Sequence, residues 1–138
     1  MRMNLWAVLV GAVLYMALGF VWYSPLLCGP TFIALMKLTP EQAAKLGEGM
    51  GPSYALMTAT ALVLAASLER LTAWAGARTA GAGIGVALLA WLPAVLTIGI
   101  STVIFESRPL GLFLLNGGYH LVAFVLIGAL VAVWRKKA

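Results

Sequence analysis

Four long apolar runs, separated by three charge-bearing gaps, dominate the pattern along this chain. They cover Leu5–Tyr23, Tyr54–Leu71, Ala82–Phe105 and Leu112–Trp134. A helix rises ~1.5 Å per residue, and the hydrocarbon layer of a bilayer is ~30 Å thick. The first, third and fourth runs are therefore long enough to cross a membrane. We predict an all-α fold, a four-helix transmembrane bundle that forms a single integral-membrane domain over residues 1–138.

The second and third runs carry features that affect how they pack. Glu69 and Arg70 cut the second run short, and its alanine-rich middle suits burial between helices better than contact with lipid. The third run contains Pro93, which lacks a backbone donor and pushes away the carbonyl of Leu89. We therefore expect a bend greater than ~20° at Pro93.

The first gap, Ser24–Ser53, is the only substantial segment between the runs. Thr39 precedes a proline and stands three residues before Gln42, which is the pattern of a capping box. We predict a short helix that begins there and ends at about Leu46. The apolar segment Phe32–Met36 is too short to span a membrane, so we expect it to lie at the interface.

The composition supports a membrane protein. The chain is 63% hydrophobic and 9% charged, with a mean hydropathy of +1.02. A soluble domain of 138 residues cannot hide that much apolar surface, whereas lipid solvates it. The net charge of +5 would favour nucleic-acid binding in a soluble protein. Here the basic residues are interpreted as topology signals, so we expect membrane lipids as partners and no nucleic acid.

The distribution of the basic residues predicts the orientation. With four spans, both termini and the gap near residues 69–81 lie on one side. That side holds Arg2, Arg70, Arg78, Arg135, Lys136 and Lys137, with Glu69 as its single acid. The other side holds Lys37, Lys45 and Arg108. Because basic residues concentrate in the cytoplasm, we predict a multi-pass protein with both termini cytoplasmic.

Glycines are the candidate packing residues, because small side chains let helix backbones approach in lipid. Gly81 and Gly85 form a GxxxG pattern at the start of the third run. The full set predicted to pack between helices is Gly11, Gly19, Gly81, Gly85, Gly117, Gly118 and Gly128.

One polar cluster stands out in the fourth run. Asn116, Tyr119 and His120 are separated by three and four residues, which places them on one helical face. At ~1.5 Å per residue, His120 lies ~12 Å below the outer end of the run at Leu112. An ionisable residue at this depth is a candidate functional residue, because burying it without a partner is costly.

Other spans place polar groups at matching depths. Thr97 and Tyr15 lie as deep as His120, and Ser101 shares the shallower layer of Asn116. We therefore predict one outer-facing polar cavity lined by several spans, in which His120 hydrogen-bonds to Tyr15 or Thr97. The second run's candidate is Thr58, and the residues expected around the mouth are Glu106, Arg108, Tyr23 and Tyr54.

Two interpretations of His120 stay open. It either joins helices as a neutral hydrogen-bonding group or forms part of a ligand or ion site. No acid lies deep in any run, so a metal site at His120 would lack its usual second ligand. Cys28 is the single cysteine, which excludes an intramolecular disulfide and a thiolate metal cage. We expect no metal, no cofactor and no catalytic residues.

Several short segments resemble a known family. Trp22-Tyr23-Ser24-Pro25-Leu26-Leu27-Cys28-Gly29 ends the first run, Gly49-Met50-Gly51 precedes Tyr54, and Gly118-Tyr119 lies in the fourth run. Together they resemble the small bacterial integral-membrane family catalogued as domain of unknown function 1761. The resemblance implies a four-helix protein of the bacterial inner membrane with no established activity, and it supplies no catalytic residues.

Three functions are compatible with these patterns. The first is a non-enzymatic membrane protein that binds or moves a small ligand through the polar cavity. Because a 14.5-kDa chain leaves little room for a gated path, a homo-oligomer is expected. The second is a structural or accessory subunit that docks on a larger membrane partner through its glycine faces. The third, a membrane enzyme, would depend on His120 as general base without an orienting carboxylate nearby in the sequence.

Overall fold

The computed structural model describes residues 2–135, which form six helices and no strand. Four helices are long: α1 (Leu5–Trp22), α4 (Gly51–Trp74), α5 (Ala80–Phe105) and α6 (Leu110–Val133). Two are short: α2 (Gly29–Leu35) and α3 (Pro40–Ala44). All four long helices are long and apolar enough to cross a membrane, so the predicted all-α, four-span fold is confirmed.

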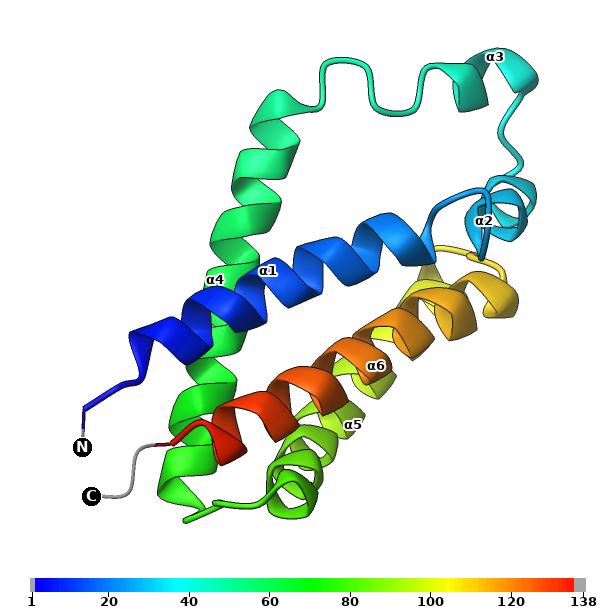
Figure 1. Cartoon of the computed structure of the whole chain (residues 1–138). Helices are drawn as coiled ribbons and strands as arrows, with labels where there is room; N and C mark the ends of the chain where they lie inside the picture. Colours follow the sequence, from blue (N-terminus) through cyan, green and yellow to red (C-terminus); the bar gives the residue numbers. More distant parts are fainter. Residues whose placement is uncertain (1, 136–138) are drawn as a thin grey trace.

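Both described ends of the chain lie at the same end of the bundle, which we call the terminal end (Figure 1). The opposite end, the loop end, carries the connection between α1 and α4 and the short connection between α5 and α6. The long helices begin where the local sequence satisfies their free backbone donors. The Asn4 side chain accepts from Ala7 N at the start of α1, and Thr79 accepts from Ala82 N at the start of α5.

Helix α4 extends well beyond the apolar run that predicts it. It begins at Gly51 and continues through Glu69 and Arg70 to Trp74. The helix therefore continues past the two charged residues that cut the apolar run short. Glu69 is only 3% exposed, because its side chain turns into the bundle instead of ending the helix.

The two halves of α4 have different surroundings. In the half near the terminal end, Ala61, Ala65 and Leu68 are fully buried against α1 and α6. At the loop end, every residue from 51 to 60 is exposed. Figure 1 shows α4 crossing α1 and then standing apart from the other long helices. The part of α4 at the loop end is therefore packed against few other residues of the protein.

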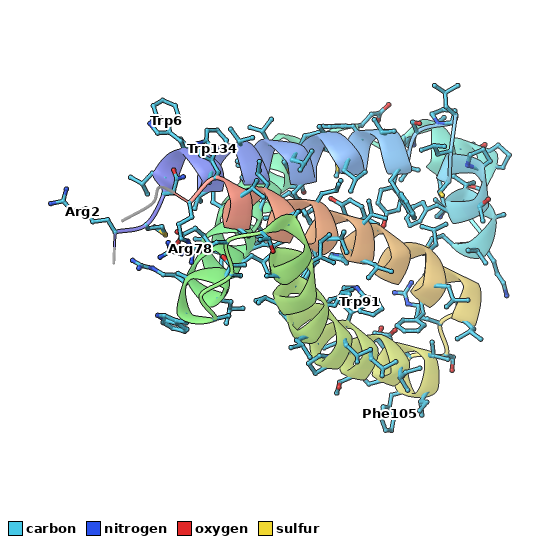
Figure 2. All side chains as sticks on the ribbon, turned by 60° about the horizontal axis from the view of Figure 1, so that its bottom comes forward. Arg2, Trp6, Arg78, Trp91, Phe105 and Trp134 are labelled. Atoms are coloured by element: carbon cyan, nitrogen blue, oxygen red, sulfur yellow. The ribbon has the colours of Figure 1, made fainter. Side chains whose placement is uncertain are left out.

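Helices α5 and α6 form the most extensive pair. They approach closely at Gly83 and Gly128, where a Cβ atom on Gly128 would lie 2.6 Å from the carbonyl oxygen of Gly83. Figure 2 shows them diverging toward the loop end, with Trp91 in the space between them. Helix α5 continues through Pro93 without interruption. The bend expected there stays a prediction.

The α1–α4 connection contains two short helices. The predicted capping box is confirmed: Thr39 accepts from Gln42 N, and the Gln42 side chain accepts from Thr39 N. The helix it begins, α3, ends at Ala44 rather than at Leu46. The apolar segment predicted to lie at the interface belongs to α2, whose Leu35 packs beside Gly111 at the start of α6.

Candidate functional site

A hydrogen-bonded group joins α1 to α6 near the middle of the bundle. The Tyr15 hydroxyl lies 3.3 Å from Nε2 of His120. The Tyr119 hydroxyl donates to the carbonyl oxygen of Tyr15 at 2.7 Å. The predicted hydrogen bond between His120 and another span is therefore present, and Tyr15 is the residue that makes it.

The hydrogen-bond partners of His120 determine the tautomer of its imidazole ring. Nδ1 lies 2.8 Å from the carbonyl oxygen of Asn116, which can only accept, so Nδ1 carries the hydrogen. In the neutral ring, Nε2 is then an acceptor, and the Tyr15 hydroxyl donates to it. Both ring nitrogens of His120 are thus engaged inside the bundle, Nδ1 by Asn116 and Nε2 by Tyr15.

A second link joins the same helices nearer the loop end. The Tyr23 hydroxyl donates to Oδ1 of Asn116 at 2.6 Å. Burial raises the pKa of Tyr23, and the neighbouring Tyr15 and Cys28 add smaller increases, so that the pKa is about 12. The Tyr23 phenol therefore keeps its proton and stays a donor, which fixes the orientation of the Asn116 amide.

A cavity of about 570 Å³ lies between α5, α6 and α2. We call it the α5–α6 cavity. His120 and Asn116 contribute the polar groups of its α6 wall. Its complete lining is Phe32, Met36, Ala94, Val95, Ile98, Gly99, Thr102, Glu106, Arg108, Leu112, Phe113, Asn116, Gly117 and His120. Gly99 is the place on α5 that accommodates the ring of Phe113, since a Cβ atom there would overlap that ring.

Two opposite charges lie on the rim of this cavity at the loop end. Nε of Arg108 is 3.7 Å from Oε2 of Glu106, and both side chains are about half exposed, at 47% and 60%. Nη1 of Arg108 also contacts the sulfur of Met36 at 3.6 Å. A thioether is a weak acceptor, so the guanidinium keeps donors that are not strongly engaged.

A second cavity lies on the other side of α1 and α6. This α1–α4 groove has a volume of about 760 Å³ and contains the aromatic side chains Tyr23, Phe32, Tyr54 and Tyr119. The remaining lining is Met16, Gly19, Phe20, Pro25, Gly29, Pro30, Ile33, Leu46, Gly47, Met50 and Met57. The matching depths predicted a single cavity, whereas the structure of residues 2–135 has two. Tyr119 lines one of them, and His120 and Asn116 line the other.

Tyr15, which bonds to His120, lines neither cavity, and three further predicted polar residues do not reach the α5–α6 cavity. Thr97 is exposed and absent from its lining, and the Ser101 hydroxyl donates to the carbonyl oxygen of Ile98 in its own helix. Thr58 is exposed and donates to the carbonyl oxygen of Tyr54. Thr97 lies as deep as His120, but its direction around the axis of α5 does not bring it into the cavity. Thr102, which the prediction omitted, lines the cavity instead.

The glycines fall into two groups. Five of them pack against side chains or backbone of another helix: Gly11 against Ala65, Gly19 against Tyr119, Gly117 against Val95, Gly118 against Trp22 and Gly128 against Gly83. Gly81 and Gly85 have no atom within 4 Å of the position of a Cβ, so they make no close contact within residues 2–135. The close approach on α5 is made by Gly83, which is two residues away and faces α6.

Sequence reasoning missed a polar cluster at the terminal end, which we call the terminal clasp (Asn4, Glu69, Thr72 and Arg135). Nη2 of Arg135 donates to Thr72 Oγ1 at 2.8 Å and to the carbonyl oxygen of Glu69 at 3.0 Å. Asn4 N donates to Oε1 of Glu69 at 3.3 Å. Oε2 of Glu69 and Nε of Arg135 are buried without a hydrogen-bond partner. The one feature of the sequence that could have indicated this cluster is Glu69, an acid within an apolar run.

The model of a family described as "Protein of unknown function (DUF1761)" matches residues 6–132. The chain belongs to this family. No curated protein and no solved structure shows a significant match to the DUF1761 chain.

The matched range runs from the first turn of α1 to the last turn of α6 and includes the lining of both cavities of the DUF1761 chain. Within residues 2–135, no group of three or more His, Cys, Asp or Glu side chains is placed to hold a metal ion. The α5–α6 cavity is therefore lined by the polar side chains of His120 and Asn116, by the charged pair at its rim and by apolar side chains elsewhere.

Proposed function

We propose that this membrane protein binds or moves a small ligand in the α5–α6 cavity. The observation that carries the proposal is the placement of His120 and Asn116 on the wall of a largely apolar cavity whose rim carries Glu106 and Arg108. A few placed polar groups in an apolar hollow are typical of small-molecule sites. The volume of about 570 Å³ lies within the range of ~300–1,000 Å³ that such sites occupy.

The polar groups in the cavity are held by partners outside it. Tyr15 donates to His120, and Tyr23 donates to Asn116, so each side chain is oriented before a ligand arrives. A preorganised site loses less free energy on binding, because its side chains are already ordered. This arrangement favours binding over a purely structural role for the pair.

We further propose that the terminal end faces the cytoplasm of a bacterial cell and that the α5–α6 cavity opens outward. Arg2 and Arg78 lie at the terminal end, together with Trp134, whereas Phe105 lies at the opposite end (Figure 2). Basic residues are enriched in cytoplasmic segments, and tryptophans are enriched at membrane interfaces.

The proposal is tested by filling the cavity. The protein is extracted from native membranes in polymer-bounded discs, and co-purifying small molecules are measured by mass spectrometry. V95W fills the cavity, and H120L removes its hydrogen-bonding group. V63W is the matched control, because Val63 lies on α4 and is 66% exposed. A molecule retained by the unchanged protein and V63W but lost from V95W and H120L supports the function. Identical contents in all four proteins overturn it.

A second candidate is an accessory subunit that packs on another membrane protein or on a second copy. Gly81 and Gly85 are exposed, one turn apart, with open space around them on α5. GxxxG faces allow close approach of helices in lipid. Replacing both glycines with leucine should then abolish cross-linking through α5 while leaving the α5–α6 cavity unchanged. Unaltered cross-linking in that variant would exclude this face as the docking surface.

A further inference from the structure

The rim of the α5–α6 cavity carries one positive and one negative charge that are weakly engaged with each other. The Arg108–Glu106 distance of 3.7 Å is long for an ion pair, and both side chains are about half exposed. Exposed pairs of this kind contribute little, because water and salt screen them. Each charge is therefore available to a ligand group of opposite sign.

Below the rim the character of the cavity changes. Val95, Ile98 and Phe113 provide an apolar lining, and His120 lies at the deep end. Along α6 the distance from Leu112, near the rim, to His120 is ~12 Å at ~1.5 Å per residue. The cavity is thus an apolar hollow with a charged entrance of no net charge.

We propose that the α5–α6 cavity takes an amphiphile with a zwitterionic head, whose cationic group binds Glu106 and whose anionic group binds Arg108. Its apolar part occupies the hollow below. This inference rests on the proposed function, because it names the class of ligand for the same cavity.

A ligand with a single charge fits this entrance less well. An anion that approaches Arg108 also meets the carboxylate of Glu106, and a cation that approaches Glu106 meets the guanidinium. In either case the ligand gains one attraction and one repulsion. A head with both charges, a few bonds apart, replaces the internal pair with two favourable contacts and leaves no charge unpaired.

Two sources supply this chemistry. A bilayer lipid with an ammonium and a phosphate would reach the rim, because Glu106 and Arg108 directly follow the end of α5, a helix long enough to cross the bilayer. A free apolar amino acid carries an ammonium and a carboxylate and would enter from water. Both have the zwitterionic head, and the experiment separates them.

The experiment uses native mass spectrometry of the full-length protein in detergent, with phosphatidylethanolamine and phosphatidylglycerol added in equal amounts. The first lipid is zwitterionic and the second is anionic. We expect the unchanged protein to retain phosphatidylethanolamine in preference by about three- to fivefold, the size that exposed charge contacts support. Free leucine is added in a second series. If leucine displaces the lipid, the ligand is a free amino acid that enters from water.

Variants of the rim test the two contacts separately. E106Q removes the partner of the ammonium, so it should bind both lipids equally. R108Q removes the partner of the phosphate, so it should lose retention of both. E48Q and K45Q are the controls, because Glu48 and Lys45 are exposed charges of the α3–α4 segment and do not line the cavity. These two variants should behave as the unchanged protein does.

The outcomes separate this inference from the proposed function. If V95W expels the bound lipid but E106Q and R108Q keep the original preference, the zwitterion is excluded while the cavity remains a binding site. If V95W binds both lipids as before, the lipid lies outside the cavity and both proposals fail in this assay. Preference for phosphatidylglycerol in the unchanged protein would also overturn the zwitterionic head.

Discussion

The phenolic oxygen of Tyr15 lies 3.3 Å from Nε2 of His120 and joins α1 to α6 in the interior of the bundle. Nδ1 of His120 donates to the carbonyl oxygen of Asn116, so Nε2 is the ring nitrogen that accepts from Tyr15. A residue of α1 therefore orients a side chain that lines the α5–α6 cavity.

Tyr15→Phe should lower the stability of the protein modestly. Hydrogen bonds between helices in membranes contribute ~0.6 kcal/mol on average and at most ~2 kcal/mol. The melting temperature in detergent measures the effect, and a double-mutant cycle with His120→Leu measures the coupling between the two side chains. Tyr54→Phe is the matched control, because the Tyr54 ring packs on Phe20 from an exposed position. A coupling energy near zero would contradict the bond.

Gly83→Ala should destabilise the protein far more than Gly85→Ala. A Cβ atom on Gly83 would overlap the Gly128 backbone, and overpacking of this kind costs ~1–3 kcal/mol. Gly85 faces open space, so alanine there should leave the stability unchanged or raise it by up to ~1 kcal/mol. Thermal unfolding of both variants provides the comparison. Equal losses would show that α5 presents a different face to α6.

Arg135→Leu should loosen the terminal clasp. It removes two hydrogen bonds from a charged donor to α4, each of a kind worth ~1.5–3 kcal/mol. We expect faster amide hydrogen exchange in the last turn of α6 and a lower melting temperature. Arg78→Leu is the control, because Arg78 is exposed beyond the end of α4. Unchanged exchange in Arg135→Leu would contradict the clasp.

Tyr23 should give the stability a dependence on alkaline pH. Its pKa is about 12 in the folded protein and near 10.0 without these surroundings. Below pH 10 both states hold the proton, and Tyr23 adds no pH dependence. Between pH 10 and 12 the unfolded state releases the proton first, so the free energy of unfolding falls as pH rises. Phenolate absorbance should show this late titration, and Tyr23→Phe should remove it.

The orientation is tested with fused reporters. A reporter placed after residue 138 should be active in the cytoplasm, and one placed within 45–51 should be active outside. The distribution of basic residues is the reason, because segments rich in lysine and arginine stay in the cytoplasm. An external C-terminus, or activity of both reporters on both sides, would contradict the orientation.

Hydrophobic length was sufficient to predict three of the four long helices, because the bilayer requires a minimum apolar run whatever the packing. The second run is shorter, and α4 extends beyond it at both ends. The capping box at Thr39 was equally predictable, since it depends on residues three positions apart. Depth along the helices was informative too, because it named Tyr15 and Thr97 as the candidate partners of His120, and Tyr15 makes the bond.

Direction around each helix axis was not predictable. In a soluble bundle the polar face shows which side is outside, but a helix in lipid is apolar all round. Thr97 and Gly81 illustrate the consequence. Each lies two residues from a position that faces α6, and two residues turn a helix by ~200°. Val95 and Gly99 therefore face α6 where Thr97 does not.

Glu69 was missed for a related reason. A charged residue near the end of an apolar run is usually a boundary signal, and only tertiary structure shows that Asn4 and Arg135 approach it. Those contacts join residues from opposite ends of the sequence. Local patterns contain no information about such a meeting, so the clasp could not have been expected from the sequence.

The short connection of residues 106–109 has a consequence for biogenesis. Closing a short loop costs less chain entropy than closing a long one, and the α1–α4 connection of residues 23–50 is much longer. Helices α5 and α6 therefore form a hairpin that can pair on its own during insertion. The α5 and α6 walls of the cavity can then form without α1, and the bond between Tyr15 and His120 forms when α1 packs against α6.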